Sequence, residues 1–342
     1  MKFKTKLSFD DVLLVPQKSS IESRKQVNIT TNIGNRNFCL PIISSPMDTV
    51  TEHKMALSVA WSGGFGIVHR YNSILQQADH IRKITDKDTE GDFPVAAAVG
   101  VSSDFIERSS ALVDAGAFLI CIDVAHGHHT NVERAIKRLK DKYSDSISIM
   151  AGNVATKEAF YDLQSWGADA IRVGVGGGSI CSTRIHTAHG VPTFSSVLDC
   201  QSVADSAVIV ADGGIKNAGD IVKCLAAGAD FVMLGSLLAG TDESPGDILV
   251  DSNGIKTKTY RGMASVEAQV QWRGQARSLE GVATTVPYKG KVSNILSDLA
   301  QNIRSGLSYS GARSISEFRN KAKFIMQTPS GLTESRTHIL LK

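Results

Sequence analysis

The sequence has few aromatic residues, little net charge and no long apolar run. Aromatic residues make up 6% of the 342 positions, and 37 basic side chains nearly balance 34 acidic ones, which leaves a net charge of +3. No block of like charge suggests a tail that binds nucleic acid or a membrane. No apolar run approaches the roughly 18 residues of a membrane span, and the first residues, MKFKTKLSFDDVLL, lack the apolar core of a secretory signal. These absences predict a cytoplasmic protein whose partner is a small molecule.

Cysteine is also scarce. The five cysteines, Cys39, Cys121, Cys181, Cys200 and Cys224, are odd in number, widely spaced and without a CxxC pair. This pattern argues against a disulfide framework and against a thiolate zinc site, so we expect reduced thiols. We interpret all of them except Cys181 as small buried hydrophobic side chains.

Eight short apolar runs recur along the chain, at 41–46, 65–69, 94–100, 118–124, 146–153, 170–176, 207–214 and 231–236. Segments with helical spacing separate them, and several end in a glycine that is typical of a helix cap. This repeat predicts a (β/α)₈ TIM barrel in the α/β class, with a doubly wound open sheet as the alternative. No linker divides the chain, so we expect one domain over 1–342. It would include a flap at about 264–285 and a C-terminal extension at about 286–342 that wraps the catalytic face.

Polar residues follow these runs where barrel enzymes carry their chemistry, at the carboxyl ends of the strands. They are Ser45 and Met47, His69, Asp123, Asn153, the loop from Gly174, the Asp212-Gly213-Gly214 turn, and Gly235 with Ser236. Glycines after the seventh and eighth runs would let backbone N–H groups approach an anion, which predicts a phosphorylated ligand. Asp212 could accept hydrogen bonds from a ribose, or it could cap the next helix.

The stretch GVGGGSICSTR, residues 174–184, places one thiol after a glycine-rich loop. A thiolate is a strong nucleophile, and backbone N–H groups or a cation such as Arg184 favour its formation. A glycine loop at the catalytic rim is a poor place to bury a side chain. We therefore predict that Cys181 is a catalytic nucleophile.

This loop resembles the active-site loop of the IMP dehydrogenase/GMP reductase family, G-x-G-P-G-S-[IV]-C-T-T-R, with Gly177 in place of proline and Ser182 in place of the first threonine. Similar motifs extend along the chain and include LSFDDVLLVP (7–16), SSPMDTVTE (44–52), AGNVAT, VADGG, YRGMAS (260–265), EGVATTVPYKG (280–290) and RSGLSYSGA (304–312). The regulatory CBS module that most IMP dehydrogenases insert after the second barrel helix has no room in the short stretch 86–92.

The resemblance implies that Cys181 attacks C2 of a purine 5′-monophosphate, GMP or IMP, where a nicotinamide cofactor exchanges hydride. It implies catalytic roles for Cys181, Thr183 and Glu280. It implies substrate contacts through Ser45, Met47, Ser179, Asp212, Gly214, Gly235, Ser236, Tyr260, Gly262, Met263 and Arg277, and cofactor contacts through Asp123, Asn153, Gly174 and Gly176. It also implies a potassium ion on backbone carbonyls of Gly176, Gly178 and Cys181, and a homotetramer.

The flap favours one of the two family reactions. The segment QWRGQARSLEG, residues 271–281, lacks the Arg-Tyr pair with which the dehydrogenases activate water, and Arg277 precedes Glu280 by three residues, as in the reductases. We therefore predict an NADPH-dependent GMP reductase. The segments 234–247 and 331–338 look more like the dehydrogenase, so an IMP dehydrogenase that uses NAD, with Arg273 or Arg277 activating water, is the alternative, as is a reductase for a modified purine nucleotide.

Two further classes remain open on sequence alone. The cluster HGHH, residues 126–129, follows the fourth run, and His-x-His at a strand end holds a metal in some hydrolases. A non-catalytic nucleotide sensor would need no nucleophile at Cys181.

Overall fold

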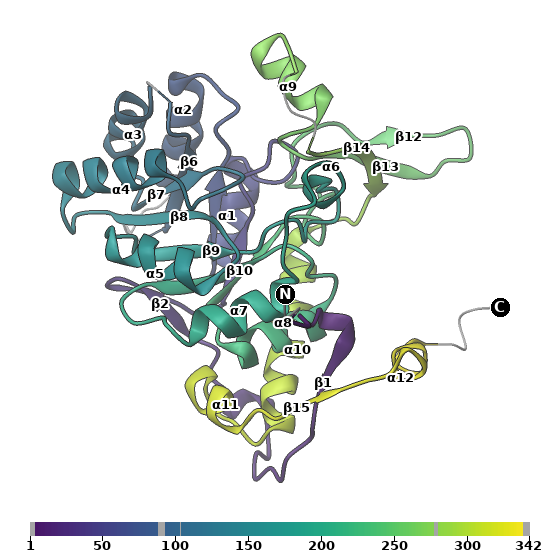
Figure 1. Cartoon of the computed structure of the whole chain (residues 1–342). Coiled ribbons are helices and arrows are strands. Elements are labelled where there is room, and N and C mark those ends of the chain that lie inside the picture. The colour runs from purple at the N-terminus through teal and green to yellow at the C-terminus, as the bar shows by residue number, and fades with distance from the viewer. Residues whose placement is uncertain (1–3, 88–92, 103, 277–279, 338–342) are drawn as a thin grey trace.

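The computed structural model of the chain describes residues 4–87, 93–102, 104–276 and 280–337, and eight parallel strands at its centre form a closed barrel (Figure 1). The barrel strands, in order, are β4 (Ile42–Ser44), β5 (Phe65–Val68), β6 (Val95–Val99), β7 (Leu119–Asp123), β8 (Ser148–Val154), β9 (Ala170–Val173), β10 (Val208–Asp212) and β11 (Phe231–Leu234). The last strand pairs with the first, with Val232 opposite Ile42. The predicted TIM barrel is confirmed, and the open sheet is wrong.

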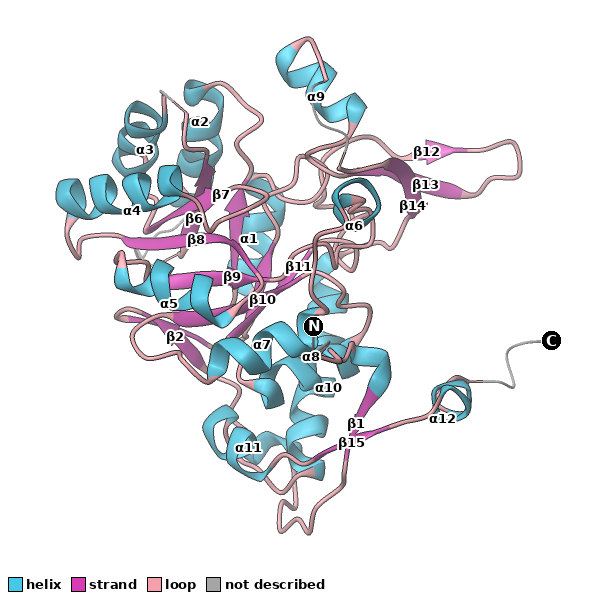
Figure 2. Ribbon diagram, viewed as in Figure 1, coloured by secondary structure: helices cyan, strands magenta, loops and turns pink. Residues whose placement is uncertain are grey.

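Helices cover the outside of the barrel (Figure 2). They are α1 (His53–Trp61), α2 (Ile74–Thr85), α3 (Phe105–Asp114), α4 (Thr130–Tyr143), α5 (Lys157–Ser165), α7 (Thr193–Gln201), α8 (Ala218–Ala227) and α10 (Val292–Tyr309). Since α2 ends at Thr85 and β6 begins at Val95, the connection between them is too short for an inserted module.

One helix of the C-terminal extension lies on the outside of the barrel. Helix α10 packs against α1 and α8, so it takes the place of the barrel helix that follows β11. Its buried residues, Val292, Leu296, Leu299, Ile303 and Leu307, recur every three or four positions and form the apolar face that this place requires. Helix α10 therefore completes the outer layer of helices and does not wrap the catalytic face.

The remaining elements close the ends of the barrel. A hairpin of β2 (Thr31–Ile33) and β3 (Arg36–Phe38) inserts Phe38 beside Phe65 and Phe231, with ring centroids 4.9 and 5.4 Å away. Because Phe65 and Phe231 are the first residues of their strands, this cluster fills the amino end of the barrel. The carboxyl end is left for the polar residues.

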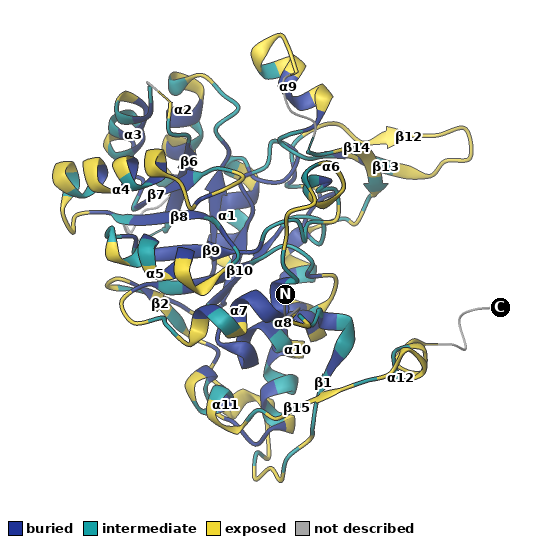
Figure 3. Cartoon of the chain, viewed as in Figure 1, coloured by how far each residue is buried: buried dark blue, intermediate teal, exposed yellow. Residues whose placement is uncertain are grey.

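An antiparallel sheet stands over the carboxyl end, built from β12 (Leu249–Val250), β13 (Lys256–Arg261) and β14 (Ala283–Pro287), with α9 (Val266–Arg273) between its last two strands. It is more exposed than the barrel (Figure 3). The other elements are η1 (Phe9–Asp11), η2 (Arg24–Gln26), β1 (Val12–Leu14) paired with β15 (Phe324–Met326), α6 (Thr183–Thr187), α11 (Ile315–Lys321) and α12 (Pro329–Glu334). None of the helices in the described ranges is both long and apolar enough to cross a membrane.

Three of the four cysteines interpreted as core residues are buried, and one is not. Burial raises the pKa of Cys121 and of Cys200 to about 12, and it raises the pKa of Cys224 as well, so these thiols are inert. Cys39, in contrast, is exposed. It follows Phe38, whose side chain enters the barrel, and successive side chains of an extended segment point in opposite directions.

Candidate active site

The polar groups that we expected at the carboxyl ends of the strands line one cavity, except for His69, which is buried beside Glu52. The volume of this cavity is about 300 Å³, which is in the range of sites for small ligands. Every predicted site residue that the structure describes lies on its wall: Ser45, Met47, Asp123, Asn153, Gly174, Gly176, Gly178, Ser179, Cys181, Thr183, Asp212, Gly214, Gly235, Ser236, Tyr260, Gly262, Met263 and Glu280. Arg277 lies outside the described residues.

Cys181 begins a chain of polar side chains that links the barrel to the flap. Its sulfur lies 3.2 Å from Oγ1 of Thr183, and the Thr183 hydroxyl donates to Oε2 of Glu280 at 2.8 Å. The backbone holds the two segments together, because Ser182 N donates to the Glu280 carbonyl at 3.0 Å and Cys181 pairs with Gly281 in an antiparallel bridge. An acid–base group must lie within hydrogen-bonding reach of the proton that it moves. This chain meets that condition for a ligand held against the thiol.

Close packing of two strand ends explains the glycine that opens the cysteine loop. Gly174 has a φ of +149°, and a Cβ there would lie 1.8 Å from the Asp212 carbonyl oxygen. Any side chain would push β9 and β10 apart where their ends form the floor of the cavity. Glycine is required at this position by the close approach and by its backbone conformation.

Hydroxyl groups gather beside the glycines of the expected phosphate site. Oη of Tyr260 lies 3.4 Å from Oγ of Ser179, and it also contacts the Ser236 side chain. A Cβ on Gly235 would approach that same Oη to 3.1 Å, so a side chain at this position would crowd the tyrosine hydroxyl. Burial raises the pKa of Tyr260, which keeps its hydroxyl protonated and able to donate to an anion.

A buried arginine that sequence reasoning missed organises the floor of the cavity. Arg172 of β9 donates to Asp123 Oδ1 at 2.5 Å and to Asp212 Oδ2 at 2.9 Å, and Asn153 Nδ2 donates to the same Asp212 oxygen at 2.7 Å. Burial opposes the charge on Arg172, but the carboxylates of Asp212 and Asp123 outweigh it and raise its pKa. The signal that could have found it is a single charged residue inside the apolar run AIRVGVG.

The structural alternative for Asp212 is wrong. Asp212 does not cap the following helix, because the Asn217 side chain accepts from Asp220 N at the start of α8. The guanidinium of Arg184 donates to the Val191 carbonyl at 2.8 Å. The neighbour of the Cys181 sulfur is the Thr183 hydroxyl.

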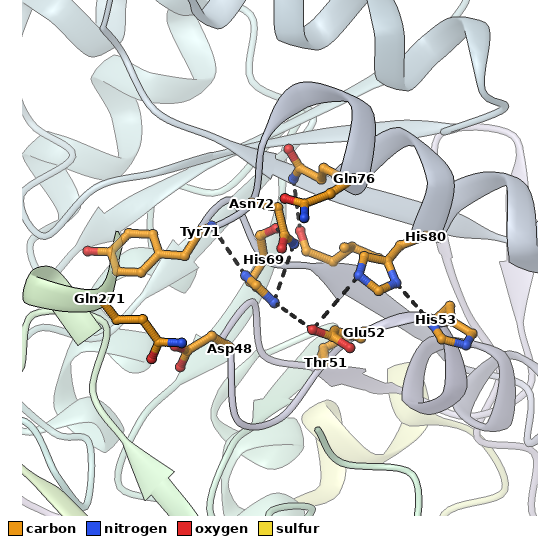
Figure 4. Close-up of polar contacts among 12 residues, drawn as sticks. Asp48, Thr51, Glu52, His53, His69, Tyr71, Asn72, Gln76, His80 and Gln271 are labelled. Carbon is orange, nitrogen blue, oxygen red and sulfur yellow. Dashed lines mark hydrogen bonds and ion pairs between the residues drawn. The ribbon is translucent and has the colours of Figure 1, made fainter. Parts of the chain in front are cut away.

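The flap rests on a tyrosine that follows β5. Tyr71 donates its hydroxyl to the Met263 carbonyl at 2.6 Å, and its ring stacks on Trp272 of α9 with centroids 5.6 Å apart and planes 11° apart. His69 fixes the start of this loop by accepting from Tyr71 N at 3.2 Å (Figure 4). These contacts set the position of α9 over the cavity, and sequence reasoning missed Tyr71.

A second cavity, of about 390 Å³, lies beside the first. Its wall includes Arg70, Arg108, Arg273 and Trp272, with Asp104 as its one acidic residue. Arg70 lines both cavities, so they meet at this side chain. Arg70 also pairs with Asp123 at 3.5 Å and Arg108 with Asp104 at 3.0 Å, so carboxylates balance part of this basic wall.

Two of the three histidines of the HGHH cluster, His128 and His129, have structural partners. His128 Nε2 lies 2.8 Å from Asp162 Oδ2, and His129 Nδ1 accepts from Asn131 N at the start of α4. In the part of the chain that the structure describes, the group of potential metal ligands that does come together is Glu52, His53 and His80. The motif that prompted a metal hydrolase therefore forms no metal site among these residues.

Comparisons with known proteins agree with the motifs. The profile of the IMP dehydrogenase / GMP reductase domain matches residues 6–338. An inosine-5′-monophosphate dehydrogenase from Borreliella burgdorferi is 38% identical, with 98% of this chain and 97% of that protein aligned. A GMP reductase from Leishmania major is 33% identical, with 98% and 97% aligned. The crystal structure of a cysteine-to-alanine variant of GMP reductase from Trypanosoma brucei, in complex with guanosine 5′-monophosphate, is similar with a TM-score of 0.93 and 33% identity over 98% of both chains.

Proposed function

Because this chain belongs to the IMP dehydrogenase/GMP reductase family of NAD(P)-dependent oxidoreductases, we propose that it is a GMP reductase. The reaction would convert GMP, NADPH and a proton to IMP, NADP⁺ and ammonia. The contact chain from the Cys181 thiol through Thr183 to Glu280 carries this proposal.

The chain of contacts supplies the proton chemistry that deamination requires. The Cys181 sulfur would add to C2 of the purine, and the 2-amino group would leave as ammonia after receiving a proton from Glu280 through the Thr183 hydroxyl. NADPH, when bound, supplies the hydride that replaces the carbon–sulfur bond at C2 and releases the thiolate. Water would compete with this step, so the flap anchored by Tyr71 and Trp272 would serve to exclude it.

The cavity offers groups that suit a purine 5′-monophosphate. We place the phosphate among the hydroxyls of Ser179, Ser236 and Tyr260 and the N–H groups of Gly214 and Gly235. Asp212 would accept hydrogen bonds from the ribose, while Ser45, Met47, Gly262 and Met263 would contact the ribose and the base. The guanosine 5′-monophosphate bound by the trypanosomal reductase supports this class of ligand.

The residues also fit a nicotinamide cofactor. Asp123, Asn153, Gly174 and Gly176 lie on the side of the first cavity that we assign to the nicotinamide. The arginine-rich second cavity supports phosphate groups beyond it, and the 2′-phosphate of NADPH would add a charge that these side chains can pair.

We also propose a potassium ion at the cysteine loop, because hard cations favour oxygen ligands such as backbone carbonyls. We place it on the carbonyls of Gly176, Gly178 and Cys181. The loop already turns through a hydrogen bond from Cys181 N to the Gly178 carbonyl at 3.1 Å. The ion would supply a charge that holds this turn in place.

We also propose that the chain assembles as a homotetramer, in which the hairpin of β12 and β13 contacts a neighbouring subunit. Leu249, Val250 and Ile255 on this hairpin are exposed, and a neighbouring subunit would cover them. Light scattering of the purified protein tests this assembly.

An IMP dehydrogenase is the second candidate. The dehydrogenase-like segments 234–247 and 331–338 and the dehydrogenases among the relatives favour it. In that case an arginine of the flap, Arg273 or Arg277, would activate water to hydrolyse the adduct on Cys181.

Nicotinamide absorbance separates the candidates. With GMP and NADPH we expect loss of the reduced-cofactor band, release of ammonia, and abolition of both by Cys181→Ala. A gain of that band with IMP and NAD instead would establish the dehydrogenase. Turnover in neither mixture would direct the search to modified purine monophosphates.

A further inference from the structure

Outside the cavity, two histidines and a glutamate meet between α1 and α2. Nδ1 of His53 lies 3.0 Å from Nδ1 of His80, and the two rings lie edge to edge with centroids 5.1 Å apart and planes 23° apart (Figure 4). Glu52 approaches the other side of His80, with Oε1 3.8 Å from Nε2. A ring nitrogen of each histidine and a carboxylate oxygen of Glu52 all lie within 4.8 Å of one another.

The spacing and chemistry of these groups suit a transition-metal ion. Zinc binds imidazole nitrogen and carboxylate oxygen at about 2.0–2.2 Å in a tetrahedron, which sets its ligand atoms roughly 3.3 Å apart. The two Nδ1 atoms are 3.0 Å apart, and rotation of both rings and of the Glu52 side chain would bring the three ligand atoms to this spacing. This rotation costs no helix cap, because the Glu52 side chain makes no capping hydrogen bond to α1.

A second histidine orients the carboxylate from behind. His69 Nδ1 accepts from Tyr71 N, and its Nε2 lies 3.4 Å from Glu52 Oε1. Metal-binding carboxylates commonly have such a hydrogen-bonded partner. The site would also communicate with the loop of Tyr71, on which the flap rests.

We propose that Glu52, His53 and His80 bind one divalent transition-metal ion of the zinc class, with a water in the fourth position, and thereby clamp α1 to α2. The site is distinct from the cavity that holds Cys181, and it does not depend on which reaction the enzyme catalyses.

Cobalt titration of the full-length protein, freed of metal by a chelator, tests the site. We expect one equivalent of Co²⁺ to bind with the visible absorption of a tetrahedral nitrogen and oxygen site. The substitutions His53→Gln and His80→Ala should each weaken binding at least tenfold, whereas the control His128→Ala, at a half-exposed histidine paired with Asp162, should leave it unchanged.

Thermal unfolding gives a second readout. Zn²⁺ should raise the Tm of the wild-type chain and of His128→Ala but not that of the His53→Gln/His80→Ala double variant, whose circular dichroism without metal confirms that it folds. Equal Co²⁺ binding by the double variant, a thiolate charge-transfer band that places the ion on cysteine, or no stoichiometric binding would each overturn the proposal.

Discussion

Removal of the carboxylate at Glu280 tests the proton chain on which the proposed reaction depends. The substitution Glu280→Gln keeps the size of the side chain and its place beside Thr183, 2.8 Å from the hydroxyl, but it removes the acid. General acid–base catalysis contributes roughly 10²- to 10⁴-fold. We therefore expect kcat for GMP reduction to fall at least about 100-fold, while the KM for GMP stays within about threefold.

A double-mutant cycle asks whether the contacts act as one chain. Thr183→Val removes the hydroxyl between the Cys181 thiol and Glu280 and preserves its shape. If protons pass through Thr183 to Glu280, either change breaks the path, and the double variant loses about as much rate as the worse single variant. Independent roles would instead multiply the two losses.

The assay is steady-state oxidation of NADPH with GMP, together with ammonia release. The control is Glu267→Gln on α9, which removes an exposed carboxylate of the same flap and should leave kcat unchanged. A kcat of Glu280→Gln within threefold of the wild type, or multiplicative losses in the cycle, would refute the proposed relay.

Three further substitutions test the walls of the cavity. Gly174→Ala places a Cβ 1.8 Å from the Asp212 carbonyl oxygen and should lower the free energy of unfolding in urea by at least about 3 kcal/mol. The control Gly254→Ala, at a φ of +78° with nothing within 4 Å of its Cβ, should lower it by only about 1–2 kcal/mol. Equal losses would contradict the packing argument. Arg172→Met leaves two carboxylates without their buried cation and should lower the free energy of unfolding by about 3–5 kcal/mol, and a loss below 1 kcal/mol would show that they find other partners. Tyr260→Phe removes a hydroxyl from the expected phosphate site. Because a hydrogen bond to a charged group contributes about 1.5–3 kcal/mol, the KM for the monophosphate should rise about tenfold or more. An unchanged KM would place the phosphate elsewhere.

The sequence by itself determined the barrel and most of its site. Eight short apolar runs separated by helical segments have few ways to bury their surface, and parallel strands bring the residues at their carboxyl ends to one rim. Cys181 and Asp212 could thus be assigned to one cavity although they lie in different loops. Local motifs sufficed to place these residues because each one follows a barrel strand, and the carboxyl ends of all these strands lie at the same rim.

Tertiary structure decided what depends on contacts between distant segments. The spacing of apolar residues in α10 predicts a helix, but only the gap between α1 and α8 makes it the eighth helix of the barrel. Arg172 looked like one charge in an apolar strand, and its role appeared once Asp123 and Asp212 faced it across the barrel. His53 and His80 are 27 positions apart on separate helices, and their meeting depends on how those helices pack. Side chains that act through a partner on another element cannot be recognised until the fold supplies that partner.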